Sequence, residues 1–315
     1  MKDTFEREIT YLRVSVTDLC NLRCRYCMGE DGVEKLSHSD ILSHEEIEEI
    51  VRAAVDCGVR KVRVTGGEPL VRPGIVDICR RIGAIEGVEE LCLTTNGVLL
   101  PRFAKDLHSA GVARLNISLD TLRAERYVDI TRIGTLENAL DGLKAAKEAG
   151  FPPPKINCVL MGGVNDDEIP DFVELTRNEA VSVRFIELMP IGPCMGWDRR
   201  RFIPDEAVLR AVPELEPVQD DSDGVARLYR LPDGAGTVGL IRPVSDHFCP
   251  NCNRLRLTAD GKLKPCLHSA LEIPVRGLHG DELTATIRQA VLAKPQRHHL
   301  DEGSESLRNM NAIGG

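Results

Sequence analysis

The chain has 315 residues, of which 42% are hydrophobic and 28% charged, and its formal net charge is −9. This balance is typical of a globular protein with enough apolar surface for a core, and it excludes a disordered chain, a collagen and a coiled coil. The acidic net charge argues against general binding to nucleic acid or to an anionic membrane. No apolar run approaches the roughly 20 residues that cross a bilayer. The charged start of the chain is unlike a signal peptide, so we expect a cytoplasmic protein.

Short apolar segments rich in β-branched residues recur over the first two thirds of the chain, and helical patterns separate most of them. The segments lie at 12–16, 61–65, 90–95, 114–119, 155–160 and 183–187. The clearest helix spans 43–57, where Ser43 and Glu46 form a capping box and Ile47, Ile50 and Val51 share an apolar face. Alternating strands and helices predict a parallel α/β sheet, here an incomplete (β/α)6 barrel of the TIM type.

The pattern changes near residue 205. Prolines and aspartates over 213–234 indicate turns, and the next clear helix begins near Asp281. We therefore expect a partial barrel over 1–205 and a smaller C-terminal region over 206–315. The segment from Gly234 to Gly239 matches G-x-G-x-x-G, but it follows a Pro-Asp-Gly turn and leads into no helix. It predicts a hairpin turn and not a dinucleotide site.

Six of the 11 cysteines form two clusters, and the odd total argues against a disulfide framework. We expect most of the other five to be buried as small apolar residues. The first cluster, Cys20, Cys24 and Cys27, follows a predicted strand. Three thiolates on one loop can hold three irons of a [4Fe–4S] cluster and leave the fourth iron open to a small chelating molecule. A zinc site is the alternative, which the missing fourth ligand weakens.

The first cluster, Cys20-Asn21-Leu22-Arg23-Cys24-Arg25-Tyr26-Cys27, and the later Gly66-Gly67-Glu68-Pro69 together resemble the radical S-adenosylmethionine (SAM) superfamily. The resemblance implies that SAM chelates the open iron through its amino and carboxylate groups. One electron from the cluster then cleaves SAM to methionine and a 5′-deoxyadenosyl radical. Gly67 would allow a close approach of the backbone to the methionine moiety, which a Cβ would hinder.

The second cluster consists of Cys249, Cys252 and Cys266. Its spacing alone leaves open a Cys3His zinc site completed by His268. However, the segment 248–267 resembles the C-terminal cluster region of the GTP 3′,8-cyclase family, which takes the first step of molybdenum cofactor biosynthesis. The likeness runs over essentially the whole chain and includes the terminal Gly314-Gly315. It implies a second [4Fe–4S] cluster whose open iron faces the substrate, and a tail that enters the active-site pocket.

Basic residues lie on several predicted strands. Arg254 and Arg256 alternate and therefore point to one face, where two guanidiniums suit a triphosphate. A solvated charged face is the alternative. Cations on buried strands need an anion, which could be a shared ligand or a neighbouring Asp or Glu. These cations are Arg13, Arg63, Lys155 and Arg184.

The resemblance assigns roles residue by residue. Arg254 and Arg256 are the candidate catalytic residues. The positions that match GTP contacts are Arg13, Arg63, Thr94, Lys155, Arg254, Leu255 and Arg256. The positions that match SAM contacts are Tyr26, Gly67, Ser118 and Met189. Arg184 and Lys61 match less closely, and Cys194 and Met195 receive no role. The family more often has Gly where this chain has Glu6, before Arg7, and we expect this difference to affect only a surface turn.

The resemblance implies a lyase that converts GTP to (8S)-3′,8-cyclo-7,8-dihydroguanosine 5′-triphosphate. The 5′-deoxyadenosyl radical would take hydrogen from C3′ of the ribose, and C3′ would then attack C8 of guanine. An electron donor, transfer of the product to cyclic pyranopterin monophosphate synthase, and a homodimer are further expectations. Two alternatives stay open, namely a radical SAM enzyme that modifies a peptide with an auxiliary cluster, and a zinc-binding interaction module.

Overall fold

The computed structural model describes residues 1–33, 36–204, 206–219, 225–246, 248–298, 300 and 308–314. Over these residues the strands form one sheet in the order β12-β11-β10-β1-β2-β3-β4-β5-β6-β9-β8-β7. The strands from β10 to β9 in this order pair in parallel. They are β10 (Arg254–Leu257), β1 (Tyr11–Ser15), β2 (Lys61–Thr65), β3 (Glu90–Thr95), β4 (Arg114–Ser118), β5 (Lys155–Leu160), β6 (Ser182–Glu187) and β9 (Thr237–Ile241).

Antiparallel strands flank this parallel core at both edges. They are β11 (Lys262–Lys264), β12 (Ile273–Pro274), β8 (Arg227–Arg230) and β7 (Glu216–Pro217). The sheet is therefore an open, mostly parallel partial barrel, as predicted. The predicted hairpin is confirmed, because β8 and β9 pair antiparallel and the G-x-G-x-x-G segment runs from the turn between them into β9.

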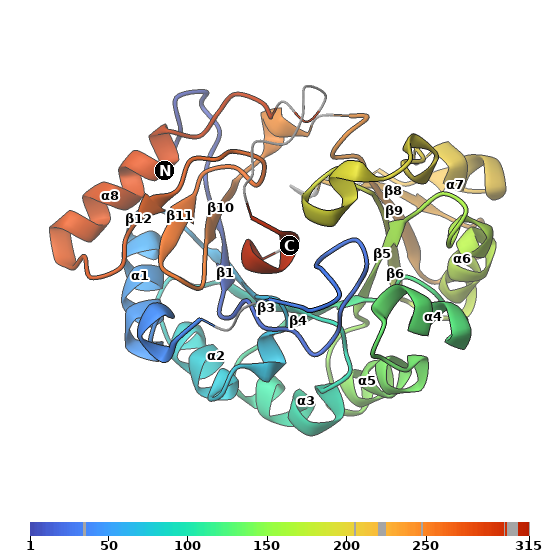
Figure 1. The fold of residues 1–315 in the computed structure, drawn as a ribbon, viewed down its shortest axis with the longest axis horizontal. Coiled ribbons are helices and arrows are strands. Elements are labelled where there is room, and N and C mark those ends of the chain that lie inside the picture. The colour runs from blue at the N-terminus through green and yellow to red at the C-terminus, as the bar shows by residue number, and fades with distance from the viewer. Residues whose placement is uncertain are drawn as a thin grey trace.

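Helices cover the outer, convex face of the curved sheet, and the C-terminal segment lies inside the curve (Figure 1). The helices are α1 (His44–Asp56), α2 (Ile75–Gly83), α3 (Leu100–Ser109), α4 (Ala124–Thr131), α5 (Leu136–Glu148), α6 (Ile169–Asn178), α7 (Glu206–Ala211) and α8 (Gly280–Leu292). Short 3₁₀ turns occur at His38–Asp40, Pro69–Val71, Asp166–Glu168, Gly192–Gly196, Arg199–Arg201, Cys249–Asn251 and Met310–Ala312. No described helix is long and apolar enough to span a membrane.

The capping box predicted for α1 is present. Ser43 Oγ accepts from Glu46 N at 3.1 Å, and the Glu46 carboxylate accepts from Ser43 N at 2.7 Å. These bonds satisfy two amide groups that the first helical turn leaves unpaired. Ile47, Ile50 and Val51 are buried against the sheet. The same apolar layer between helices and sheet continues under α5, α6 and α7.

Alternation along β1 separates the two faces of the sheet. Leu12 and Val14 belong to the apolar core beneath the helices. Successive side chains on a strand point to opposite faces, so Tyr11, Arg13 and Ser15 point to the inner, concave face. The interior of the curve is therefore polar, and its floor is made by strands whose carboxyl ends carry the loops described next.

Candidate active site

The first cysteine loop directly follows β1. Cys27 N donates to Cys24 O at 2.9 Å, and Leu22 N donates to Cys20 Sγ at 3.3 Å. Burial raises the pKa of all three thiols, and the neighbouring thiols of the loop raise the values of Cys24 and Cys27 further. The three thiols therefore lie close enough for their thiolates to repel one another. Iron relieves that repulsion, so this donor set fits a [4Fe–4S] cluster.

The turn after β2 packs directly on this loop. Gly67 N donates to Thr17 O and Glu68 N to Leu19 O, both at 2.8 Å. A Cβ on Gly67 would lie 2.4 Å from Leu19 O and 2.6 Å from Asp18 O. Gly67 therefore lies too close to the chain that leads to Cys20 for any side chain to fit. This packing requires glycine independently of any contact with SAM.

Glu68 joins the ends of β2 and β3. Its buried carboxylate accepts from Leu70 N at 3.0 Å, Thr95 Oγ1 at 2.7 Å and Asn96 N at 2.7 Å. Burial raises its pKa to about 7 although these donors lower it. Asn96 in turn donates from Nδ2 to Asn21 Oδ1 at 2.8 Å. The glutamate of the motif therefore positions the cysteine loop, a role that the sequence analysis missed.

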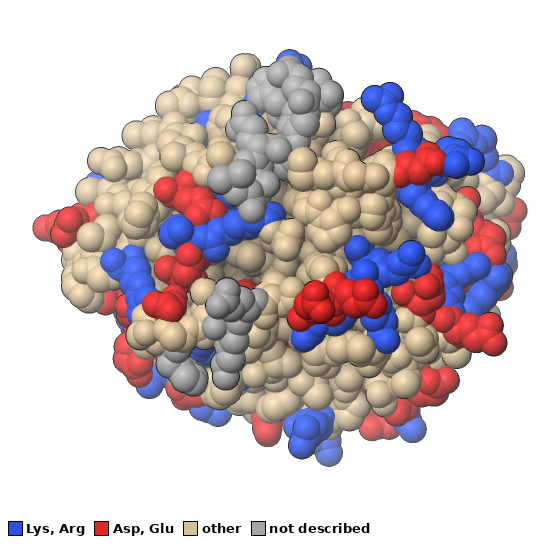
Figure 2. Space-filling model, in the orientation of Figure 1, with Lys and Arg blue, Asp and Glu red and all other residues tan. Residues whose placement is uncertain are grey.

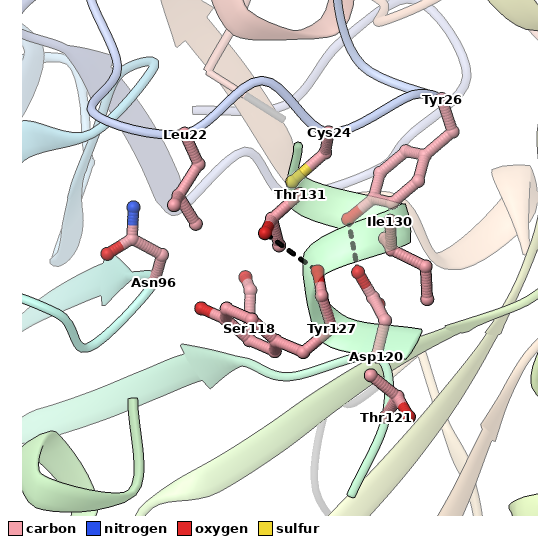
Figure 3. A pocket seen from close by; sticks show the side chains of 10 residues that line it. All are labelled: Leu22, Cys24, Tyr26, Asn96, Ser118, Asp120, Thr121, Tyr127, Ile130 and Thr131. Carbon is pink, nitrogen blue, oxygen red and sulfur yellow. Dashed lines mark hydrogen bonds between the residues drawn. The ribbon is translucent and has the colours of Figure 1, made fainter. Parts of the chain in front are cut away.

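A small pocket opens beside Cys24 (Figure 3). Two of the predicted SAM-contact residues, Tyr26 and Ser118, line it, whereas Gly67 and Met189 do not. Met189 follows the carboxyl end of β6, where its carbonyl accepts from Ile191 N at 2.8 Å. The full lining is Leu22, Cys24, Tyr26, Asn96, Ser118, Asp120, Thr121, Tyr127, Ile130 and Thr131.

Asp120 and Tyr127 are lining residues that the sequence analysis missed. Asp120 is buried and accepts from Tyr26 Oη at 2.8 Å and from Val159 N at 2.9 Å. Burial raises its pKa to about 6. Its place two residues after β4, at the carboxyl edge of a parallel sheet, is the one signal that could have indicated it.

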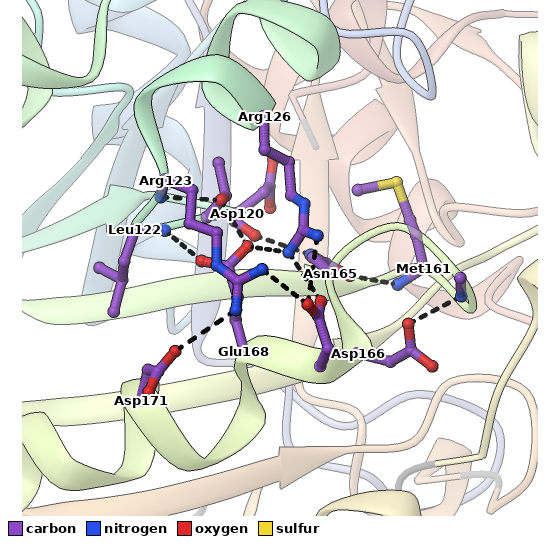
Figure 4. A network of polar contacts seen from close by, with 12 residues as sticks. Asp120, Leu122, Arg123, Arg126, Met161, Asn165, Asp166, Glu168 and Asp171 are labelled. Atoms are coloured by element: carbon purple, nitrogen blue, oxygen red, sulfur yellow. Dashed lines mark hydrogen bonds and ion pairs between the residues drawn. The ribbon is translucent and has the colours of Figure 1, made fainter.

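A polar network fixes the loop after β4 (Figure 4). Glu168 is fully buried and accepts from Thr121 Oγ1 at 2.6 Å and from Leu122 N at 2.7 Å. Arg126 pairs with the same carboxylate. Asn165 Nδ2 donates to the backbone carbonyl of Asp120 at 2.7 Å. These hydrogen bonds fix the backbone around Asp120, which lines the cavity.

A row of arginines crosses three neighbouring strands on the inner face. Arg13 is in register with Arg256 of β10 on one side and with Arg63 of β2 on the other. Residues in register point to the same face, so the three guanidiniums lie together. Arg63 Nη1 lies 3.4 Å from Thr94 Oγ1, and Arg254 stacks 5.5 Å from the Tyr11 ring.

Like charges dominate around this row. Burial lowers the pKa of Arg256 to about 10, with Arg254 adding to the shift. Burial also lowers the pKa of Lys155 on β5 to about 8, and Arg184 lowers it further. This electrostatic environment favours a polyanion. Lys61, by contrast, pairs with the neighbouring carboxylate of Glu90, so its charge already has an anionic partner within the protein.

The basic residues of the outer surface have a different arrangement. Basic and acidic side chains are interspersed on the face shown in Figure 2, with no large basic surface. Among the predicted GTP contacts, Leu255 turns its side chain into the apolar core and is in register with Leu12 of β1.

The C-terminal tail reaches the arginine row, as predicted. Gly314 O accepts from Arg256 Nη1 at 2.6 Å and from Arg13 Nε at 3.1 Å. Gly314 has a φ of 66°, and a Cβ there would lie 2.4 Å from Thr65 Oγ1. Glycine is therefore required for the tail to fit. Gly315 lies outside the described residues.

The second cysteine cluster lies where β10 and β11 meet the N-terminal segment. Burial raises the pKa of Cys249, as do Cys266 and Cys252 nearby. For Cys252 burial has the same effect, but Lys294 and Arg254 outweigh it and lower the pKa. Three neighbouring thiols beside cations fit a second [4Fe–4S] cluster.

His268, the fourth ligand of the zinc alternative, packs its ring 4.6 Å from that of His298. Over the described residues, no three His, Cys, Asp or Glu side chains converge on one ion. A [4Fe–4S] cluster needs a wider spacing, because each thiolate binds a different iron.

The difference at Glu6 falls on a surface turn, as expected, since Glu6 is exposed and pairs with Lys2. The residue after it points inward. Arg7 is buried and pairs with buried Asp3 at 2.7 Å. Its Nη1 donates to Cys249 O at 2.8 Å and its Nη2 to Pro295 O at 2.7 Å. The N-terminal segment thus supports the second cysteine loop.

The scattered cysteines are all buried, as expected. Cys194 donates from Sγ to Tyr26 O at 3.2 Å and so supports the backbone of the first cysteine loop. Met195 is 61% exposed, and nothing in the structure gives it a role.

Comparison with known proteins defines the class first. Residues 14–176 match the model of the radical SAM superfamily, and residues 181–300 match that of Molybdenum Cofactor Synthesis C. The fold resembles Streptococcus suis SuiB bound to S-adenosylmethionine, with a TM-score of 0.58 and 15% identity over 97% of this chain and 75% of that one. It also resembles anSMEcpe with bound AdoMet, with a TM-score of 0.56 and 12% identity over 95% and 84%.

Closer relatives define the family. The chain is 48% identical to the GTP 3′,8-cyclase of Alkaliphilus metalliredigens and 51% identical to that of Pelotomaculum thermopropionicum, over 100% of both chains in each case. The chain belongs to the GTP 3′,8-cyclase family of radical SAM enzymes.

Proposed function

We propose that the chain converts GTP to (8S)-3′,8-cyclo-7,8-dihydroguanosine 5′-triphosphate, the first step of molybdenum cofactor biosynthesis. The observation that carries this proposal is the register of Arg256, Arg13 and Arg63 across three adjacent strands. The middle strand, β1, leads directly into the first cysteine loop. A triphosphate on this row therefore lies on the same side of the sheet as the radical-initiating loop.

The six clustered cysteines hold the cofactors in this proposal. Cys20, Cys24 and Cys27 bind one [4Fe–4S] cluster, and Cys249, Cys252 and Cys266 bind the other. When bound, the clusters and SAM supply the one-electron chemistry that removes a hydrogen atom from the ribose. Tyr26, Gly67, Ser118 and Met189 contact SAM.

The protein's own residues bind and orient the substrate. Arg13, Arg63, Arg254 and Arg256 hold the triphosphate by charge-assisted hydrogen bonds, with Lys155, Thr94 and Leu255 completing the site. Arg63 and Arg256 are buried, so water competes little for these donors. The same groups fix the ribose relative to the cysteine loop, and such orientation supplies a large part of a rate enhancement.

Family membership supports three further parts of the proposal. An external donor supplies the electron, and the product passes to cyclic pyranopterin monophosphate synthase. The enzyme acts as a cytoplasmic homodimer.

Substitution of Arg256 tests the substrate assignment. In Arg256→Ala we expect measurable SAM cleavage to 5′-deoxyadenosine and a loss of about 100-fold in GTP cyclisation, because a buried charged donor to phosphate is gone. Arg52→Ala, on the exposed face of α1, is the matched control with unchanged activity. Wild-type cyclisation in Arg256→Ala would remove this residue from the site.

Metal content and substrate choice test the remaining alternatives. About eight irons per chain after anaerobic reconstitution support two [4Fe–4S] clusters. About four irons with one zinc would make the second cluster a structural zinc site. Release of 5′-deoxyadenosine with a peptide, and none with GTP, would favour the peptide-modifying enzyme.

A further inference from the structure

The cavity beside the first cysteine loop contains a buried hydroxyl group without a hydrogen-bond partner. Tyr127 on α4 is 3% exposed, and its Oη has no partner among the described residues. The same side chain lines the cavity together with Cys24, Tyr26 and Ser118 (Figure 3). A buried hydroxyl that stays unpaired is costly, so such a group indicates a missing acceptor.

The two carboxylates whose charges act on Tyr127 already accept other hydrogen bonds. Asp120 accepts from Tyr26 Oη and Val159 N, and Glu68 accepts from three donors of the β2 and β3 ends. Burial raises the pKa of Tyr127, and the charges of Cys24 and Asp120 add to the shift. The phenol is therefore protonated at neutral pH and acts as a donor.

The packing around the ring keeps the hydroxyl in the cavity. Tyr127 belongs to the same buried cluster as Leu136 and Ala139. A Cβ on Gly134 would lie 2.8 Å from Tyr127 Cε1, so the turn after α4 closes tightly on the ring.

Helix α4 is also joined to the cysteine loop by backbone hydrogen bonds. Arg23 N donates to Thr131 O and Arg25 N donates to Ile130 O, both at 3.0 Å. These bonds connect the loop residues on either side of Cys24 to the last turn of the helix that carries Tyr127. The hydroxyl is thus held in a fixed relation to the iron ligands.

We propose that Tyr127 Oη donates a hydrogen bond to SAM in this cavity, which adds a contact to Tyr26, Gly67, Ser118 and Met189. The inference rests on the proposed function, because it takes the cavity beside Cys24 as the SAM site. The partner is a hydrogen-bond acceptor of the sulfonium nucleoside, and its arrival satisfies the donor that the free protein leaves unpaired.

The experiment compares Tyr127→Phe with the wild-type holoenzyme. Calorimetric titration with SAM is done anaerobically on reconstituted protein without reductant, so that SAM stays intact. We expect the dissociation constant to rise about tenfold, because the acceptor on SAM loses its donor in a buried site. We also expect the melting temperature of the cluster-free protein to stay equal or rise, because phenylalanine keeps the ring packing and removes the unpaired hydroxyl.

Tyr229→Phe is the matched control, since Tyr229 lies on β8 at the far edge of the sheet and outside the cavity lining. It should leave both quantities unchanged. Partial cluster loading alters the stoichiometry of the titration and not the fitted affinity, so the comparison holds if the variant loads less iron. An unchanged affinity in Tyr127→Phe overturns the inference. Wild-type protein that carries both clusters and binds no SAM would instead contradict the proposed function.

Discussion

Glu6 has a backbone φ of 63°, in the left-handed region that favours glycine. The backbone must turn there so that Arg7 can enter the interior. Glu6→Gly should therefore raise the free energy of unfolding by about 1 kcal/mol, because the relief of strain exceeds the added entropy of the unfolded chain. The ion pair that Glu6 makes with Lys2 is exposed and adds little.

Urea denaturation of the cluster-free protein measures this change. Glu8→Gly is the control, since Glu8 has no positive φ and glycine there only adds chain entropy. A Glu6→Gly protein no more stable than wild type would show that this backbone conformation carries no strain.

Lys155 provides a pH-dependent signature of substrate binding. Burial and, to a smaller extent, Arg184 lower the pKa of Lys155 from 10.5 to about 8. At pH 8.5 Lys155 is therefore neutral in much of the free enzyme. A bound triphosphate favours the charged form and raises this pKa. GTP binding at pH 8.5 should therefore take up a proton, whereas binding at pH 6.5 should find Lys155 already charged.

Calorimetry of the holoenzyme in buffers of different ionisation enthalpy measures the proton uptake. Lys155→Met should bind GTP without the uptake seen in wild type at pH 8.5. Equal uptake in both proteins would place Lys155 away from the triphosphate.

The site residues that the sequence predicts lie in recognisable local motifs, whereas the site residues that it does not predict are recognised only in the folded structure. Tyr26, Ser118 and the first cysteines lie in short motifs next to strands, and the structure brings Tyr26, Ser118 and Cys24 to one cavity. Asp120 and Tyr127 are ordinary types within a loop and a helix. Only their burial beside the first cysteine loop, which depends on distant segments, distinguishes them.

At the scale of elements, the sequence predicts the βα alternation up to β6, because each segment carries its own periodicity. It does not predict that β9 and β10 extend the parallel sheet at its two edges. Strand β10 pairs with β1 across more than 240 residues of chain, as in the register of Leu12 with Leu255. No local pattern encodes such a partner, since pairing depends on which edges the rest of the fold leaves open.

The N-terminal segment and the second cysteine loop form one unit through Arg7. In Arg7→Met the carbonyls of Cys249, Pro295 and Gln296 lose their donor, and Asp3 is left buried without its cation. Breaking a buried pair on one side costs about 3–5 kcal/mol. We expect the second cysteine loop to loosen, so that the iron content falls from about eight per chain toward about four.

Iron and sulfide analysis after reconstitution measures this loss, and SAM cleavage without GTP reports on the first cluster separately. Arg52→Met, on the exposed side of α1, should keep the full iron content. Full content in Arg7→Met as well would mean that the cysteine loop needs no support from the N-terminal segment.

At the scale of the whole molecule, the C-terminal tail meets β1, β10 and the chain before the first cysteine loop inside the curve of the sheet (Figure 1). The carbonyl group of Gly314 in the tail accepts hydrogen bonds from Arg13 and Arg256. Asn311 Nδ2 donates to Asp18 O at 3.0 Å beside the first cysteine loop. The same short segment thus touches the arginine row and the chain that leads to the iron ligands, and its position affects both halves of the site.

Arg308 holds the base of this tail. It donates to Asp260 at 2.7 and 3.0 Å and to Glu272 at 2.6 and 2.8 Å. Asp260 lies just before β11 and Glu272 just before β12. Bidentate pairs of this kind give geometric precision as well as energy. In Arg308→Met the tail should leave the arginine row more often, and carboxypeptidase should remove its terminal residues several-fold faster than in wild type.

Digestion rates followed by mass spectrometry measure the exposure of the tail, and GTP cyclisation should fall in proportion to it. Arg80→Met on α2 is a suitable control, because Arg80 makes only an exposed pair with Asp77. Equal digestion rates in all three proteins would show that contacts with Arg13 and Arg256 hold the tail without Arg308. Comparing the loss of cyclisation with the digestion rate also separates two roles of Arg308. Lost activity without faster digestion would mean that Arg308 acts through β11 and the second cysteine loop and not through the tail.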